Sequence, residues 1–330
     1  MAPGVATGFL MVNDNTNGTV TTVSGPLEFD NTAQNGNDFY GPTTSGYLNV
    51  TGGITNTATG VVGSRNGFVR FSGGGNYTSF VLNQGTTSLG ANNGLSTSAS
   101  LTLSSSGSST FDLNGFNQTL TGLADGVTPA NSELVTNSSA TPAILTVDPS
   151  SAATYSGVIG GNLALVVNGS ANLLLAGTNT YTGNTTVNGG SLELAQPGLA
   201  VNSTVTVASG AVLQLDFAVT NQVHALVLGG VSQPAGPYND VTSPSYIAGP
   251  GYLLVQPVFS GPITLLVTNS SHTLSLSWPY LGWILQSQTN SLNVGISTNW
   301  VDVAGSASVT QTNITINPAT PTEFFRLRYP

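Results

Sequence analysis

Apolar and polar residues alternate along much of this chain in short runs that are bounded by Gly, Asn, Ser and Thr. Such runs are typical of β-strands with one buried face. From Gly46 onward they recur about every ten residues, and the helical period is absent. The pattern therefore predicts an all-β fold, with strands at Tyr47–Val50, Phe68–Phe71, Ser79–Leu82, Ser100–Leu103, Thr110–Leu113, Ile144–Val147, Leu163–Val167, Thr204–Val207 and Val212–Phe217.

Two arrangements of these strands compete. Asn-Gly pairs ordinarily mark tight antiparallel hairpins, which would give a β-sandwich. Against this, the strands are very short and their spacing continues for too long to fill one sandwich. We therefore favour a parallel β-solenoid, in which short strands become stable by stacking on copies of themselves. The Asn-Gly pairs begin at Asn66, Asn93, Asn114, Asn168 and Asn188.

The segment Leu173–Ala195, LLLAGTNTYTGNTTVNGGSLELA, has the form of one solenoid coil. It also resembles the autotransporter-associated β-strand repeat of secreted bacterial surface proteins, in which the pattern G-x-N-x-Y-x-G-x-T-x-V-x-x-G-x-L-x-L recurs. More degenerate copies lie at Ser156–Gly177 and Phe111–Gly126. The resemblance implies a right-handed parallel β-helix that is displayed or shed outside the cell; it implies no activity. The pattern falls on Gly177, Asn179, Tyr181, Gly183, Thr185, Val187, Gly190, Leu192 and Leu194.

Three segments are expected along the chain. Residues 1–45 do not share the solenoid rhythm and form an N-terminal strand or cap segment. Residues 46–256 form the parallel β-helix, and its Pro- and Gly-rich stretch Gly229–Pro250 is expected to loop over the last coil. Residues 257–330 form a small antiparallel β-sandwich around all three tryptophans. This module is too short for the membrane pore of an autotransporter.

The amino-acid composition limits the kinds of molecule that this chain is expected to bind. Charged residues make up 5% of the chain, lysine is absent, and the formal net charge is −9, which disfavours nucleic acid and anionic membranes. There is no cysteine, so disulfides and thiolate chemistry are excluded. No apolar run is long enough for a membrane helix. The first residues lack the features of a signal peptide, and we expect a mature or trimmed form of an extracellular or cell-surface protein.

Candidate catalytic groups are sparse, and we predict neither an enzyme nor a cofactor or metal site. Glu28 and Asp30 would share one strand face, but they lie outside the repeats, and a solvated edge is the simpler interpretation. His224 and His272 are isolated along the sequence. The segment 13–18 imitates the start of a calcium loop but lacks its charged first ligand and its final glutamate.

The arginines also suggest local roles. Arg65 and Arg70 stand apart from any acid-rich strand, so they do not form the cationic clamp of a polysaccharide lyase. Arg326 and Arg328 lie two residues apart and therefore on one face of the last strand, where pairing with nearby acids is expected.

A functional hypothesis comes from what is missing at the strand edges. Soluble β-proteins protect exposed edges with lysine, proline and inward charges, and this chain has no lysine. We expect an extracellular filament subunit that joins other copies head-to-tail through terminal strands. The apolar run Val5–Val12 would be the donor strand, with the interface residues Val5, Phe9, Leu10, Met11 and Val12.

A monomeric surface adhesin or glycan-binding stalk is the alternative. Its tip would be the C-terminal sandwich, with an aromatic platform built from Tyr280, Trp283 or Trp300. A carbohydrate-active enzyme is the third hypothesis, and it requires two convergent acids that the sequence does not supply.

Overall fold

A computed structural model describes residues 8–11, 20–29, 37–56, 61–104, 107–126, 133–256, 264–270, 272–279, 283–291, 293–317 and 322–328. The chain divides into two compact units, 1–256 and 257–330. Each unit is described by itself.

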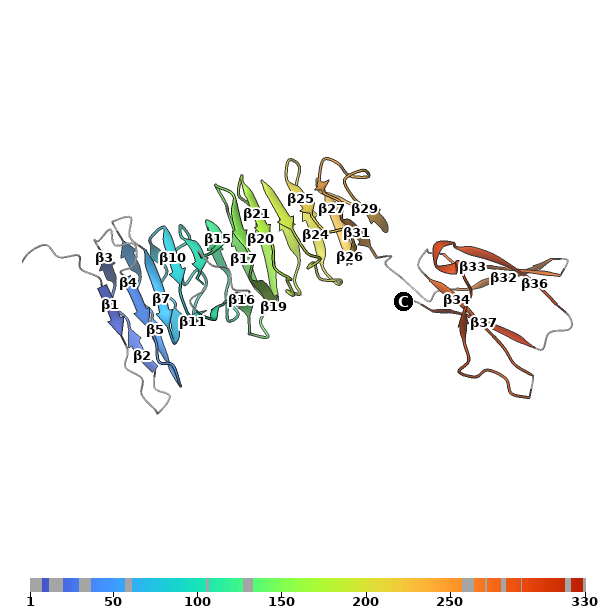
Figure 1. Cartoon of the computed structure of the whole chain (residues 1–330), viewed down its shortest axis with the longest axis horizontal. Coiled ribbons are helices and arrows are strands. Elements are labelled where there is room, and N and C mark those ends of the chain that lie inside the picture. Colours follow the sequence, from blue (N-terminus) through green and yellow to red (C-terminus); the bar gives the residue numbers. More distant parts are fainter. Residues whose placement is uncertain are drawn as a thin grey trace, which may run out of the picture. The chain divides into compact units, whose positions relative to one another are not determined.

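The first unit is a β-solenoid of about nine turns (Figure 1). Its strands fall in turn on three faces, and within each sheet a strand pairs in parallel with the strand one coil later, except at the C-terminal end. Each face consists of two successive sheets. This stacking confirms the solenoid expected from the sequence, and the antiparallel sandwich is wrong for this region.

The first face contains β1 (Gly8–Met11), β4 (Asn37–Tyr40), β7 (Val62–Asn66), β10 (Ser79–Leu82), β12 (Ser100–Leu103) and β15 (Gly122–Asp125), followed by β18 (Ala153–Tyr155), β21 (Asn172–Leu175), β23 (Ser191–Leu194), β25 (Val212–Leu215) and β30 (Ile247–Ala248). The second face contains β2 (Val20–Val23), β5 (Tyr47–Val50), β8 (Phe68–Phe71), β11 (Gly85–Leu89), β13 (Ser109–Asp112), β16 (Glu133–Asn137) and β19 (Val158–Gly161), followed by β26 (Thr220–Val223), β31 (Tyr252–Val255) and β29 (Gly236–Tyr238). The third face contains β3 (Leu27–Phe29), β6 (Ile54–Asn56) and β9 (Gly75–Asn76), followed by β14 (Gln118–Leu120), β17 (Ala143–Val147), β20 (Leu163–Val167), β22 (Thr185–Val187), β24 (Thr204–Val207), β27 (Ala225–Leu228) and β28 (Val231–Ser232).

The interior is filled by ladders of like side chains. On the third face Val147, Val167, Val187, Val207 and Leu228 follow one another in register and are all buried. The period-2 alternation of each strand produces these ladders, because it turns every second residue inward. The core continues along the whole solenoid as one hydrophobic cluster, and each buried aliphatic side chain contributes about 1.5–3 kcal/mol.

An aromatic stack occupies the N-terminal part of this core. The rings of Phe29, Phe39, Phe71 and Phe80 meet edge to face, with centroid separations of 6.4, 5.2 and 5.3 Å. Phe29 is half-buried, whereas the other three are fully buried. The stack therefore ends in a partly exposed ring in β3.

The described part of 1–45 belongs to the solenoid. β1 pairs in parallel with β4, β2 with β5, and β3 with β6. The expected break in rhythm before Gly46 is therefore not seen in these strands. Their alternation is hard to recognise in the sequence because each strand has only three or four residues.

The C-terminal end of the solenoid is built differently. β28 runs antiparallel to β27, and β29 runs antiparallel to β31. Both strands belong to the stretch Gly229–Pro250, which turns back over the last coils, as the sequence indicates. They contain only two and three residues, and Pro237 lies in the middle of β29.

The second unit is an antiparallel module of two three-stranded sheets, as expected from the sequence. Its buried core contains Leu276, Trp278 and Leu285. A short 3-10 helix, η1 (Ser306–Ser308), follows β35 (Val301–Asp302). The sheets are β32 (Leu266–Ser270), β33 (Thr273–Ser277) and β36 (Gln311–Thr315), and β35 (Val301–Asp302), β34 (Ile284–Thr289) and β37 (Glu323–Arg328). Among the described residues of both units, no helix has the length and apolar character to cross a membrane.

Candidate functional site

The glycines of the repeat motif allow close approach between coils. A Cβ atom at Gly177 would overlap the backbone oxygen of Gly157, and one at Gly183 would overlap that of Leu163. Gly190 has a φ of +57° and could not carry a Cβ without meeting the backbone of Ala171. These motif positions therefore serve the stacking of the scaffold.

The remaining motif positions are buried. The Asn179 side chain accepts a hydrogen bond from the Ile159 backbone N–H at 3.0 Å. The Tyr181 hydroxyl lies 2.7 Å from the Thr185 hydroxyl, and burial raises the pKa of Tyr181 to about 12. Val187, Leu192 and Leu194 point into the core. The motif thus describes one coil of a solenoid and no reactive centre.

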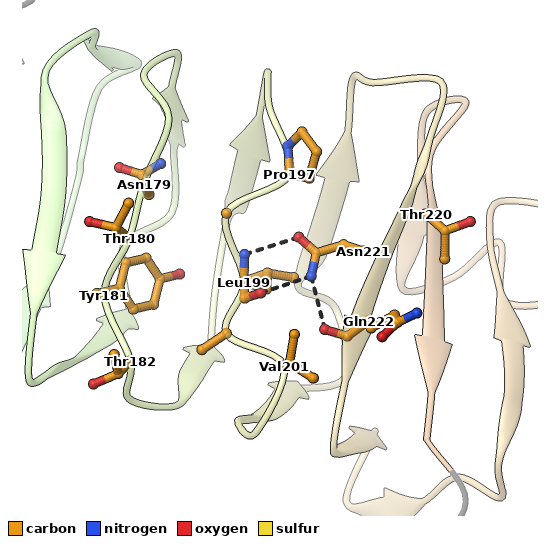
Figure 2. Close-up of a pocket in the computed structure, with 12 residues that line it drawn as sticks. Asn179, Thr180, Tyr181, Thr182, Pro197, Leu199, Val201, Thr220, Asn221 and Gln222 are labelled. Carbon is orange, nitrogen blue, oxygen red and sulfur yellow. Dashed lines mark hydrogen bonds between the residues drawn. The ribbon is translucent and has the colours of Figure 1, made fainter. Parts of the chain in front are cut away.

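After β19, two consecutive coils have no strand on the second face. In the second of these coils, the buried Leu199 has its backbone held by a side chain, as Figure 2 shows. The Asn221 amide accepts from the Leu199 N–H at 3.0 Å and donates to the Leu199 C=O at 2.8 Å. It also donates to the Gln222 C=O at 3.0 Å. We call this arrangement the amide clamp.

A second amide clamp occurs where the third face lacks a strand between β9 and β14. The Gln118 amide accepts from the Leu95 N–H at 3.1 Å and donates to the Leu95 C=O at 3.3 Å. It also donates to the C=O of the following residue, Thr119, at 2.7 Å. The two clamps replace ladder hydrogen bonds that an interrupted sheet would otherwise lose.

Both clamps leave only a weak trace in the sequence. Each held leucine follows a glycine, as Gly94-Leu95 and Gly198-Leu199, and each amide occupies the first inward position of a strand. The pairing between them spans 22 or 23 residues, so it becomes visible only once the coil length is known.

A groove of about 530 Å³ lies over the interrupted second face (Figure 2). The exposed side chains of Thr180 and Thr182 form one wall. The floor is the irregular coil 197–201, and the exposed Thr220 and Gln222 of β26 form the other wall. None of the lining residues carries a charge. We call this the flank groove.

A second groove, of about 680 Å³, lies on the first face between β15 and β18. Serine and threonine dominate its lining, and Asp125 is the one charged residue among those that line it. The Asp125 carboxylate accepts a hydrogen bond from the Ser156 N–H at 2.7 Å, which links the two sheets. Burial, with smaller effects of the Asp125 and Glu133 charges, raises the pKa of the Tyr155 hydroxyl far above its usual range.

A carboxyl pair lies on the outer surface of the first face. Asn172 donates to Glu193 at 2.6 Å, and Gln214 donates to Asp216 at 2.9 Å. Partial burial raises the pKa of Glu193; the hydrogen bond from Asn172 opposes this effect, and the Asp216 carboxyl adds to it. Among the described residues, no group of three or more His, Asp or Glu side chains is placed to hold a metal ion.

The structure describes three of the four acids and histidines considered from the sequence, and all three are exposed. Glu28 is exposed on β3, and Asp30 lies outside the described residues, as does the segment 13–18. His224 and His272 are both exposed, one in the solenoid and the other in the second unit.

Arg65 and Arg70 have local partners within the solenoid. The Arg65 guanidinium lies 2.9 Å from the buried Asp38 carboxylate. Burial raises the pKa of Asp38, and Arg65 opposes this effect. Arg70 donates to the Tyr47 hydroxyl at 3.0 Å, with its guanidinium 4.1 Å from the centre of that ring. Neither arginine forms a clamp for an anionic ligand.

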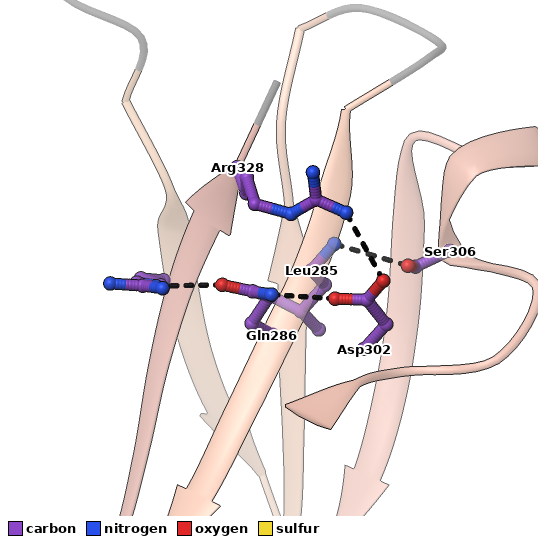
Figure 3. A network of polar contacts seen from close by, with 6 residues as sticks. Leu285, Gln286, Asp302, Ser306 and Arg328 are labelled. Carbon is purple, nitrogen blue, oxygen red and sulfur yellow. Dashed lines mark hydrogen bonds and ion pairs between the residues drawn. The ribbon is translucent and has the colours of Figure 1, made fainter. Parts of the chain in front are cut away.

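Arg326 and Arg328 are both exposed and lie on one face of β37, as expected, and Figure 3 shows Arg328 directed towards Asp302. Arg328 pairs with Asp302 at 3.2 Å, which confirms the expected pairing with an acid. Arg326 instead donates to Gln286 at 2.8 Å, and Gln286 donates to Asp302 at 2.6 Å. The Arg326 guanidinium also lies 4.2 Å from the centre of the Trp300 ring.

Of the three residues expected in the aromatic platform, the structure describes Trp283 and Trp300, and both are half-buried. Arg326 covers one face of Trp300, and Trp283 packs against the core of the second unit. Tyr280 lies outside the described residues. The glycan-binding tip therefore stays a prediction.

The predicted donor strand is a terminal strand of the first sheet. Phe9, Leu10 and Met11 lie in β1, which pairs with β4 on one side. Val5 and Val12 lie outside the described residues. Within the part of the chain that the structure describes, β1 has no strand on its other side.

Comparisons of this chain with protein-family models, with curated proteins and with solved structures find no match. The resemblance to the autotransporter-associated repeat therefore stays a prediction.

Proposed function

We propose that this chain is an extracellular structural protein that associates with other copies of itself through the N-terminal edge of its solenoid. One observation carries the proposal: β1, β2 and β3 each have a strand partner on one side only in the described part of the chain. They form the described ends of three parallel sheets, and the outer edges of β1 and β2 offer backbone hydrogen bonds to another chain.

The described strands of this edge contain no lysine and no proline, and Glu28 of β3 is their one charged residue. β2 contains no charge and no proline, and its Val20 is 46% exposed. Leu27 and Phe29 in β3 pack against the core while remaining only half-buried. An association that covers this end would bury these apolar side chains as well as pair the strands.

The opposite end favours one form of association over another. A head-to-tail filament, as first expected, needs a neighbour's last coil to accept the first coil of the next copy. On two of its three faces, the last coil is covered by the short antiparallel strands β28 and β29, and Pro237 removes a backbone donor. Two N-terminal edges can instead pair with each other across a two-fold axis. We therefore propose a pair joined at these edges.

Light scattering coupled to size-exclusion chromatography tests whether the chain forms this two-fold pair. The full chain is expected at twice its 33.4 kDa mass. The variant Val20→Lys/Thr22→Lys places two charges on the outward side of β2 and is expected to elute as a monomer. The control Thr186→Lys/Thr206→Lys adds the same charge to the outer surface of the third face and should leave the pair intact.

Negative-stain images separate the remaining outcomes. If the unmodified chain forms filaments and the variant with lysines in β2 does not, the N-terminal edge remains the contact between copies. In that case the copies join head-to-tail and not as a two-fold pair. A monomeric full chain, or an assembly that tolerates the β2 lysines, would contradict the proposal.

A further inference from the structure

We propose that the flank groove binds a neutral oligosaccharide. This inference does not depend on self-association, since the groove lies on coils far from the N-terminal edge along the solenoid. Every residue that lines it belongs to the range 179–222, whereas the proposed edge is formed by residues 8–29.

The charge of the groove selects the class of ligand. No Asp, Glu, Lys, Arg or His is among its lining residues. Phosphorylated, sulfated or uronic-acid ligands would therefore find no cation, and the formal charge of −9 on the chain repels anions at longer range. A cationic ligand would find no carboxylate in the lining. An uncharged ligand remains.

The lining suits a molecule that is apolar on one face and hydroxylated at its rim. The floor offers Pro197, the buried Leu199 and the 52% exposed Val201. The walls offer three threonine hydroxyls and the Gln222 amide, all of which can both donate and accept hydrogen bonds. A pyranose ring has this combination of C–H faces and equatorial hydroxyls, so a chain of sugars could lie on the floor while its rim meets both walls.

The groove is held in shape by the protein before any ligand arrives. The backbone N–H groups of Thr180 and Thr182 donate to Ile159 and Gly161 in the preceding coil, at 2.8 and 3.0 Å. Asn221 holds the floor through both backbone groups of Leu199. Preorganised walls and floor reduce the ordering cost of binding, and the volume of about 530 Å³ lies in the range of small-ligand sites.

Isothermal titration calorimetry on the full chain tests the proposal with cellohexaose, xylohexaose and maltohexaose as neutral probes and hexagalacturonate as the charged probe. At least one neutral probe is expected to bind, and the charged probe is not. Val201→Trp fills the groove without entering the core and should abolish binding. Thr180→Val/Thr182→Val removes two hydroxyls at nearly constant shape and should weaken binding about tenfold.

The matched control is Thr186→Val/Thr206→Val, the same two substitutions on the outer surface of the third face. It should bind like the unmodified chain, and all variants should melt within a few degrees of it. Failure of all three neutral probes to bind at millimolar concentration would overturn the proposal. Equal affinity in Val201→Trp, or equal binding of hexagalacturonate, would overturn it as well.

Discussion

The side-chain amide of Asn221 hydrogen-bonds both backbone groups of Leu199, 22 residues earlier in the chain. A strand in that place would have received two ladder hydrogen bonds from its neighbour, and the amide supplies one donor and one acceptor instead. On the third face, the Gln118 amide likewise hydrogen-bonds both backbone groups of Leu95. A coil can therefore lose its strand without leaving its buried backbone unsatisfied, and on the second face the space gained is the flank groove.

Replacing Asn221 by alanine is expected to destabilise the solenoid by about 2–6 kcal/mol, because two backbone groups of the buried Leu199 lose their partners and each costs about 1–3 kcal/mol. Urea unfolding followed by circular dichroism measures the change. Asn202→Ala makes the same substitution at an exposed position of the coil that carries Leu199, and it should stay within about 0.5 kcal/mol of the unmodified chain. Equal midpoints for the two variants would show that the clamp does not support the coil.

The parts of the fold that follow a local pattern could be predicted from the sequence. The expected strands at 47–50, 68–71 and 163–167 have the same bounds in the structure, because inward and outward residues alternate there without exception. The strands at 118–120 and 220–223 escaped recognition, because an amide occupies an inward position that a periodicity argument reserves for an apolar side chain.

The candidate site depends on relationships between coils, which a single sequence does not display. Thr180 and Gln222 lie on opposite walls of one groove although 41 residues separate them in the chain. These two residues lie at the same groove because of the coil length and because the coil between them has no strand on this face. The motif residues around Gly177 were recognised, but they turned out to serve packing.

Gly177→Ala is expected to destabilise the solenoid by about 1–3 kcal/mol, since the added methyl group would overlap the backbone of Gly157 and force two coils apart. Gly25→Ala is the matched control: it has no neighbour within 4 Å of the added atom and no positive φ, so the same substitution should be neutral or stabilise by up to about 1 kcal/mol. Thermal melts of both variants measure the difference. Similar losses at the two glycines would contradict the role assigned to the motif.

The carboxyl pair should make the solenoid less stable as the pH rises. Glu193 has a folded-state pKa above its ordinary value of 4.5, chiefly through partial burial, with Asp216 adding to the effect. The folded state therefore binds more protons than the unfolded state in the interval between the two pKa values. The stabilisation is complete below the ordinary pKa and is lost as the pH rises through the raised one.

Glu193→Gln keeps the hydrogen bond to Asn172 but cannot titrate. The stability of this variant should therefore depend less on pH in the interval between the two pKa values of Glu193. Melting temperatures measured in steps between about pH 4 and pH 8 give both curves. Identical slopes in the variant and the unmodified chain would rule out Glu193 as the group responsible.

The second unit should respond to pH in the opposite sense. The pKa of Asp302 is lowered, first by the hydrogen bond from Gln286 and then by Arg328. A lowered folded-state pKa gives stability that is present above the ordinary value and is lost as the pH falls through the folded one. Gln286→Met removes the largest cause at similar side-chain volume, so the pKa of Asp302 should rise towards its ordinary value of 3.8. Because Arg328 is unchanged, the rise should be incomplete, and Gln286→Met/Arg328→Met should raise the pKa of Asp302 further than Gln286→Met alone. Carboxyl-selective NMR titration of the full chain with labelled aspartate measures both shifts, and an unchanged Asp302 pKa in Gln286→Met would mean that the amide does not help to hold Asp302 ionised.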